Sequence, residues 1–285
     1  MRAAPRALLV PFLLAAACAF GVARPARAAD LAALWTVSLD GSFGAPSGHV
    51  QVRENAIEGT RLDLRRDLGV TTSESLALGV ARRAGAGEVS LRFEALFLYG
   101  SATLGQDVFF NGATLQGGTE LETRPEFFRA SAFYERPLAR LPGGASLRGR
   151  AGMTFVFLNF KFHGTLSPTT KATETEEGFL RQELPVPMLG LAVEAPLAGP
   201  LSFTASLDGG WLPLVNSLRT EGGVVKLKQS HADLFVGVRG ALSRSLAYTA
   251  GYRFSYFAQR EISREDDNAV RVTSHSLALS LAAGF

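Results

Sequence analysis

Cysteine is nearly absent from this chain of 285 residues: the only one is Cys18, within the first 28 residues. The part after residue 28 therefore has no thiol for disulfide or thiolate chemistry. Metal-ligand spacings such as H-E-x-x-H or paired cysteines are also missing, so we expect no metal site and no cofactor. No second apolar run of helical membrane length follows residue 28, so any later membrane span must come from strands.

The first 28 residues have the pattern of an export signal. Arg2 and Arg6 precede an apolar run over residues 7–23, and Ala26-Arg27-Ala28 offers an A-x-A cleavage site. We expect residues 1–28 to be a cleaved signal peptide and residues 29–285 to form one domain.

Two other readings of this segment stay open. Cys18 could be the acylation site of a lipoprotein, although the A-x-A site fits a start at Asp30 better. The segment could also remain as an uncleaved helix, but its apolar run is shorter than the roughly 20 residues that span a membrane.

The basic charge of the whole chain belongs to the signal. Cleavage removes Arg2, Arg6, Arg24 and Arg27 and no acidic residue, which takes the formal charge from +3 to −1. A nearly neutral domain without a basic, aromatic-interleaved patch gives no reason to expect nucleic-acid binding.

The last eleven residues alternate between apolar and small or polar side chains, as a strand with two different faces does. The apolar positions are Leu277, Leu279, Leu281, Ala283 and the terminal Phe285. An exported chain that ends on an aromatic residue at the close of such a strand resembles the bacterial outer-membrane β-barrels, in which the final strand closes the sheet.

Turn signals of two length classes predict a barrel with short inner turns and long outer loops. The short turns are 83–87, 137–144, 196–200 and 243–245. The strands predicted around them cover 34–43, 72–82, 88–100, 125–136, 146–163, 179–195, 201–215, 229–242, 246–259 and 270–285. The long loops are then 44–71, 101–124, 164–178, 216–228 and 260–269. The fold class is all-β, a transmembrane antiparallel up-and-down β-barrel of about ten strands, with eight or twelve as the alternatives.

Alternation places charges of both signs on the face opposite the aromatic and aliphatic one. The predicted lumen charges are Asp40, Arg92, Glu94, Arg129, Glu135, Arg148, Arg150, Glu194, Asp208, Asp233, Arg239 and Arg253. The same face carries Gly152, Gly190, Gly210, Gly237 and Gly251, which we expect to make room for the arginines. In a soluble sandwich, the competing fold, this face would be solvated.

In a narrow barrel we expect these residues to form an internal ion-pair network, because an unpaired charge in a confined interior costs several kcal/mol. We expect Arg148 and Arg150 to contact Glu135, Glu94 or other acidic lumen residues. A barrel of about ten strands is largely filled by side chains, whereas open porins use roughly 16 to 18 strands.

The most distinctive loop segment runs from Gly59 to Gly69 and combines leucines with Asp63, Arg65, Arg66 and Asp67. It is either a structural lid whose leucines pack on the rim, or a loop that plugs the outer mouth with those charges as polar contacts. Together with the segment 108–112, it resembles a group of outer-membrane barrels that carry "x-D-L-x-x-D-L-G" and "F-N-G" segments. That group implies the fold and no catalytic residues, because no activity is established for it.

Two outer loops are polar or acidic, and solvation is the plain explanation. The alternative is that carboxylates hold divalent cations near lipopolysaccharide phosphates. The residues concerned are Glu174, Glu176, Glu177, Glu265, Asp266 and Asp267.

No enzymatic pattern of the small barrels is visible around His49, His163, His231 and His275. None has a serine two residues later, as a barrel lipid A deacylase requires, and the phospholipase and barrel-protease patterns are also missing. His231 and Asp233 share a strand face and could form a base with its orienting partner. His275 precedes Ser276, but alternation points these two side chains to opposite faces.

The sequence therefore predicts a non-enzymatic outer-membrane barrel with a charge-filled lumen and a structural or surface-binding role. Its partners would be outer-membrane lipid, lipopolysaccharide and, during insertion, the barrel-assembly machinery, while the oligomeric state stays open. The alternatives are a narrow channel or carrier for small or apolar solutes, favoured by glycines left uncovered in the lumen, and a lipid-modifying hydrolase using His231 or His275.

Overall fold

The computed structural model describes residues 34–53, 58–110, 113–165, 173–177, 184–217, 224–264 and 267–285. The predicted signal peptide lies outside these residues, and so do Asn111 and Gly112. Within the described residues, no helix is long and apolar enough to cross a membrane.

The described residues form strands joined by turns and one short 3-10 helix, η1 (Pro142–Gly144). The strands are β1 (Trp35–Gln51), β2 (Leu62–Asp63), β3 (Thr72–Ala84), β4 (Gly87–Thr103), β5 (Val108–Phe110), β6 (Ala113–Leu115), β7 (Glu120–Thr123), β8 (Glu126–Arg140), β9 (Ser146–Thr165), β10 (Thr173–Glu177), β11 (Val186–Pro196), β12 (Leu201–Asn216), β13 (Lys226–Ala241), β14 (Leu246–Ile262) and β15 (Asp267–Gly284).

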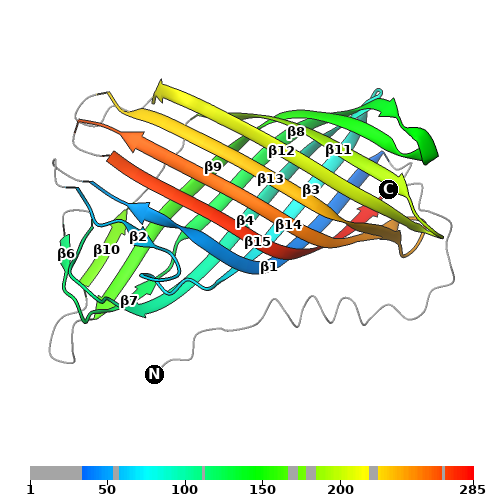
Figure 1. The fold of residues 1–285 in the computed structure, drawn as a ribbon. Coiled ribbons are helices and arrows are strands. Elements are labelled where there is room, and N and C mark those ends of the chain that lie inside the picture. The colour runs from blue at the N-terminus through cyan, green and yellow to red at the C-terminus, as the bar shows by residue number, and fades with distance from the viewer. Residues whose placement is uncertain are drawn as a thin grey trace.

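Ten of these strands close a ring: β1, β3, β4, β8, β9 and β11 to β15 pair antiparallel in chain order, and β15 returns to β1. The β1–β15 pairing extends from Thr36 opposite Gly284 to Gln51 opposite Ala269. Backbone hydrogen bonds between Trp35 and Phe285, both 3.0 Å, complete the closure. The predicted barrel and its closing terminal strand are confirmed, and Figure 1 shows the strands running obliquely around one long cylinder.

Several strands are longer than the sequence predicts. The first continues to Gln51 instead of ending at Phe43, and β14 and β15 leave only residues 263–266 of the predicted loop 260–269. The predicted loop 101–124 contains three short strands, β5 to β7. The sequence prediction ended β1 too early because Gly44, Pro46 and Gly48 are residue types typical of turns and loops.

Pro46 lies where β1 has a neighbour on one side only. β1 pairs with β3 up to Gly44, whereas its pairing with β15 continues to Gln51. A proline, which lacks the N–H, is tolerated on such an edge. On this side of β1, strand pairing resumes at His49 and Val50, which pair with β2.

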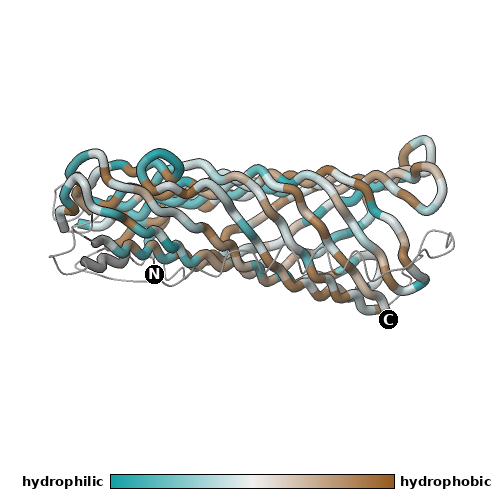
Figure 2. Tube along the Cα trace, turned by 90° about the horizontal axis from the view of Figure 1, so that it is seen from below, coloured by the Kyte–Doolittle hydropathy of each residue, from teal (hydrophilic) through white to brown (hydrophobic). Residues whose placement is uncertain are grey.

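The outer surface of the cylinder is apolar over most of its length. Exposed side chains include Leu39, Phe43, Leu78, Leu91, Phe93, Phe97, Phe157, Leu191, Leu207, Trp211, Val236, Tyr252 and Leu277. Polar residues concentrate at the end that carries β2, β6, β7 and β10 (Figure 2). A closed sheet with an apolar exterior satisfies its backbone internally and faces hydrocarbon, as a membrane-spanning barrel must. Short turns lie on the periplasmic side of such barrels and long loops outside the cell, which orients this chain.

Candidate functional site

The lumen is crossed near its middle by two arginines that meet two carboxylates. Arg129 on β8 donates to Glu94 on β4 from Nε at 2.9 Å and to Asp233 on β13 from Nη1 at 2.6 Å. Arg253 on β14 contacts the same two carboxylates, with 3.2 Å between Nη2 and Asp233 Oδ1. All four side chains are mostly buried. Because β8 is not adjacent to β13, nor β4 to β14, the pairs Arg129–Asp233 and Arg253–Glu94 span the barrel interior.

A second group of ion pairs lies along the wall beside this centre. Arg148 and Arg150 both reach Glu135, at 2.8 Å and 3.3 Å. Arg148 also lies 3.2 Å from Glu194, and Arg150 pairs with Asp208. The contacts predicted for Arg148 and Arg150 with Glu135 are present.

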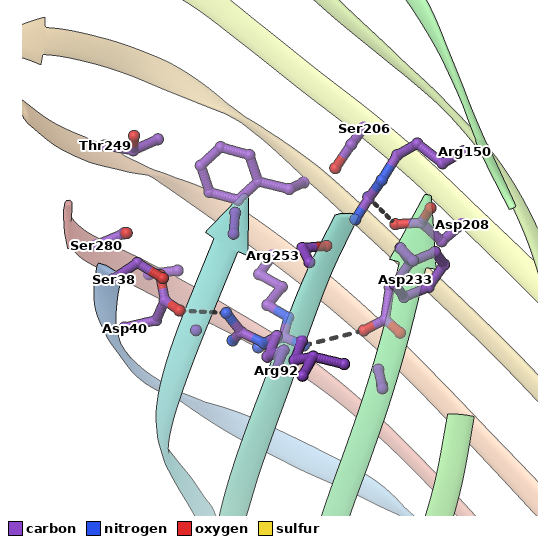
Figure 3. Close-up of a pocket in the computed structure, with 18 of the residues that line it drawn as sticks. Ser38, Asp40, Arg92, Arg150, Ser206, Asp208, Asp233, Thr249, Arg253 and Ser280 are labelled. Carbon is purple, nitrogen blue, oxygen red and sulfur yellow. Dashed lines mark hydrogen bonds and ion pairs between the residues drawn. The ribbon is translucent and has the colours of Figure 1, made fainter. Parts of the chain in front are cut away.

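Two further sequence-predicted charges extend the network, and one does not. Arg92 pairs with Asp40 (Figure 3). It also lies 3.6 Å from Glu94. Arg239 points into the lumen nearer the turns, where it lines a cavity with Glu88, and it has no ion pair among the described residues. Eleven of the twelve predicted lumen charges thus take part in these two neighbouring groups of ion pairs, which together we name the ion-pair layer: Asp40, Arg92, Glu94, Arg129, Glu135, Arg148, Arg150, Glu194, Asp208, Asp233 and Arg253.

The lumen glycines accommodate other side chains than the arginines, so that expectation was wrong. A Cβ at Gly237 or Gly251 would meet the Phe235 ring, and one at Gly152 would meet Phe133. Gly190 and Gly210 are covered in the same way by Asp208 and Met188. The guanidinium of Arg150 lies 4.7 Å from the centre of the Phe133 ring. The Phe133 ring therefore fills the space above Gly152 and supports the guanidinium of Arg150, and the Phe235 ring fills the space above Gly237 and Gly251.

On the outer side of the ion-pair layer the lumen changes to a packed apolar core. Phe127 on β8 and Phe257 on β14 meet across the barrel edge to face, with ring centres 5.2 Å apart. Phe110 from the β5–β6 hairpin packs edge to face on Phe162 at 4.4 Å. The core comprises Val50, Val52, Leu62, Leu64, Leu68, Val70, Leu98, Leu104, Val108, Phe110, Leu115, Leu121, Phe127, Val156, Leu158, Phe160, Phe162, Leu227, Phe257, Val270 and Val272.

Our reading of the sequence missed this core, although a signal was present. From Phe155 to Leu158 apolar residues occupy both faces of β9, and Phe160 and Phe162 continue the inner one, so the alternation of a barrel with a polar interior is lost. Such a run indicates a strand that is buried inside as well as lipid-covered outside.

The plug segment, residues 61–70, closes the outer end beside β1. Leu62, Leu64 and Leu68 are at most 1 % exposed and belong to the apolar core. The backbone N–H of Leu64 donates to the carbonyl of Gly48 on β1 at 3.0 Å. The segment therefore fills the wall where β3 has not yet begun, and its leucines enter the barrel instead of resting on the rim.

The two aspartates of the motif hold the plug segment in its turn. The Asp63 carboxylate accepts the backbone N–H groups of Arg65 and Arg66, both at 2.9 Å. The Asp67 carboxylate accepts the N–H of Asp63 at 2.8 Å and a charged hydrogen bond from Arg66 Nε, also 2.8 Å. The Arg66 guanidinium holds the pKa of Asp67 below its usual value. Gly69 has φ 65° and lies against the Ser101 carbonyl, so only glycine fits. The motif thus has a structural explanation.

On the periplasmic side of the ion-pair layer lies a hydroxyl-lined vestibule. A cavity of about 410 Å³ is bordered by Arg92, Arg150 and Arg253. Its serines and threonines include Thr36, Ser38, Ser90, Ser131, Thr204, Ser206, Thr249 and Ser280. A second cavity of about 390 Å³ shares Thr36, Glu88 and Thr249 with the first and reaches Pro200 at a turn. Figure 3 shows the hydroxyl groups of Ser38, Ser206, Thr249 and Ser280 around the labelled ion pairs.

Between the ion-pair layer and the apolar core little free space remains. A cavity of about 30 Å³ lies there, bordered by Glu94, Arg129, Phe127 and Phe257. This volume corresponds to about one or two water molecules. In the part of the chain that the structure describes, the vestibule thus extends from the periplasmic turns to the ion-pair layer.

Among the described residues, neither His231 nor His275 forms the pair that was considered from the sequence. His231 faces the lumen beside Phe257, ring centres 5.1 Å apart, and neither ring nitrogen has a hydrogen-bond partner among the described residues. Asp233 is engaged by two arginines. His275 faces outward and is 2.7 Å from the Tyr252 hydroxyl, whereas Ser276 is buried on the inner face.

The acidic outer loops lie mostly beyond what the structure describes. Glu265 and Asp266 fall outside it, and β10 gives only the backbone of residues 173–177. Asp267 forms an ion pair with Arg260 at 2.7 Å. Among the described residues no cluster of acidic, histidine or cysteine side chains has the arrangement of a metal site.

No family model matches the chain, and no curated protein does. Among solved structures, it is similar to the outer membrane protease OmpT from Escherichia coli, with 10% identity and a TM-score of 0.49 over 88% of this chain and 97% of that one. The translocator domain of autotransporter NalP from Neisseria meningitidis has 14% identity and a TM-score of 0.41, over 98% and 95%. The Pseudomonas putida toluene transporter TodX has 8% identity and a TM-score of 0.31, over 87% and 89%.

These values carry no argument about activity, and the assignment rests on the apolar exterior, the closed ring and the turn pattern of this chain. The protein is an outer-membrane β-barrel.

Proposed function

We propose that the protein is a non-enzymatic, non-conducting barrel that acts through its outer surface, in a structural or surface-binding role. The observation that carries this proposal is the presence of two successive barriers in one narrow lumen. The ion-pair layer spans the barrel, and the apolar core with the plug segment fills the outer half. Either barrier opposes ion flow, the first by occupying the cross-section and the second by excluding water.

The charges of the layer are arranged to stay in place. Glu94 and Asp233 each bridge Arg129 and Arg253, so removing one contact leaves the others. An opened layer would leave buried charges unpaired, at a cost of several kcal/mol each. Passage of a solute would require both this rearrangement and displacement of the plug segment.

Single-channel conductance in planar bilayers tests the proposal. The refolded mature protein should give no discrete steps. The matched variant combines Glu94→Ala and Arg129→Ala with a short Gly-Ser linker in place of the plug segment, and this variant should conduct once its folding is shown by heat-modifiability. Reproducible steps from the wild-type protein would overturn the proposal, and silence from the folded variant would show that other residues close the lumen.

A second candidate function is a gated carrier for small solutes, and the vestibule is the observation that favours it. Its serines, threonines and arginines offer donors to a polar solute from the periplasmic side. The same recording distinguishes the two functions. A gated path for solutes would show rare openings in the wild-type protein, and these would become frequent when only the plug segment is replaced.

A further inference from the structure

A hollow of about 530 Å³ lies on the outside of the barrel, at the end that carries the outer loops. We name it the basic hollow; it is lined by Ser47, Gly48, His49, Arg61, Asp63, Arg66, Arg271 and Thr273. Three segments far apart in sequence meet there. His49 on β1 is paired with Arg271 on β15 on one side and with Asp63 on the other.

Cationic groups outnumber the available anionic ones in this hollow. Arg61 Nη2 lies 3.1 Å from His49 Nδ1, and neither Arg61 nor Arg271 has an ion pair with a carboxylate among the described residues. The Asp63 carboxylate accepts two backbone N–H groups of the plug segment, and Arg66 is paired with Asp67. Two guanidinium groups and the hydroxyls of the lining therefore remain as donors for an anion.

The surface below the hollow, toward the membrane, is apolar. Phe43 on β1 and Leu277 on β15 are directly paired, and their side chains are 46% and 74% exposed. The Arg271 guanidinium lies over the ring of Tyr256, 5.2 Å from its centre, which fixes it at the edge of this surface. Donors above an exposed apolar strip match an amphiphile with an anionic head and an acyl chain.

We infer that the basic hollow binds a phosphate-bearing lipid of the outer leaflet. Arg61 and Arg271 hold the phosphate, Ser47 and Thr273 donate hydrogen bonds to it, and an acyl chain lies along Phe43 and Leu277. Guanidinium groups suit this ligand because their N–H donors match phosphate oxygens in pairs. This binding site is independent of whether the lumen conducts.

The test measures retention of lipid A by the full mature barrel in detergent, by native mass spectrometry. The probes are lipid A with both phosphates and the same lipid after dephosphorylation. The double variant Arg61→Gln and Arg271→Gln should retain at least about tenfold less phosphorylated lipid, because two charge-assisted contacts are lost. The control variant, Arg82→Gln and Arg136→Gln, changes exterior arginines near the periplasmic turns and should retain lipid within about twofold of wild type.

Each other outcome counts against the inference. Equal retention by the two double variants, both folded by heat-modifiability, would overturn the site. Equal retention of phosphorylated and dephosphorylated lipid would overturn the role of phosphate. Displacement of the lipid by an equal concentration of inorganic phosphate would show a site for free anions instead of a lipid.

Discussion

Replacing Glu94 with glutamine removes one negative charge from the centre of the ion-pair layer while keeping the side-chain shape. Glu94 is 5% exposed and contacts Arg129, Arg253 and, at 3.6 Å, Arg92. After the change, three guanidinium groups share the remaining carboxylates. Breaking a buried ion pair by removing one partner costs about 3–5 kcal/mol, so we expect Glu94→Gln to lower the free energy of unfolding by about 3 kcal/mol or more.

The matched control is the same substitution at an exposed ion pair. Glu126 lies 3.1 Å from Lys161, and both side chains are more than 40% exposed. Because solvent screens this pair, Glu126→Gln should cost less than about 1 kcal/mol. Urea unfolding in lipid vesicles, followed by the fluorescence of Trp35 and Trp211, compares the two variants. Equal losses would refute the claim that the layer is a buried network.

A double variant adds a second check. Removing Arg129 as well, by Arg129→Met, takes away a guanidinium that Glu94→Gln leaves in excess. The two changes should therefore be less than additive, with a coupling of about 1–3 kcal/mol. Strict additivity would mean that Glu94 and Arg129 act independently, against the contacts that join them.

Three further predictions concern the plug segment and the wall of the lumen. Leu64→Ala should destabilise the barrel by about 2–5 kcal/mol, because Leu64 is fully buried, whereas Leu207→Ala on the lipid face should cost much less; urea unfolding measures both. Because the folded protein lowers the pKa of Asp67, the ionised carboxylate stabilises the plug segment at any pH above the pKa that Asp67 has in the unfolded chain. This stabilisation is lost as the pH falls through the lower pKa of the folded state. The hydrogen-exchange protection of the segment, corrected for the intrinsic exchange rate at each pH, should thus fall in acid, and this fall should be absent in Asp67→Asn. Arg150→Met should lower the temperature of heat-modified migration on gels, and an unchanged temperature would contradict its two ion pairs.

The barrel could be predicted from the sequence because its periodicity is simple. Alternation at Leu277, Leu279 and Leu281 and the short turns depend only on local sequence, and they gave the ring and the faces. Alternation also assigned the lumen charges, since the side on which a residue lies follows from its position in the strand. Arg239 shows the limit, because the face is predictable but the partner is not.

The interior of the outer half could not be predicted in the same way. Leu64 and Leu68 belong to a loop, and nothing local indicates that this loop enters the barrel beside β1. Gly152 is covered by the ring of Phe133, and Gly237 and Gly251 are covered by the ring of Phe235. These rings are positioned by contacts between strands, which local sequence does not indicate. These features arise from packing across the barrel, which joins residues that are distant in sequence.

We propose that the lumen is a blind vestibule, accessible from the periplasmic end and closed toward the outside. Cysteine labelling tests it most directly, because the chain has no cysteine after Cys18. Ser280 lines the vestibule, so Ser280→Cys in oriented proteoliposomes should react with a charged, impermeant thiol reagent added on the periplasmic side and stay unreacted from the other side. Equal labelling from both sides would contradict the account, because it would require a continuous water path through the ion-pair layer and the apolar core.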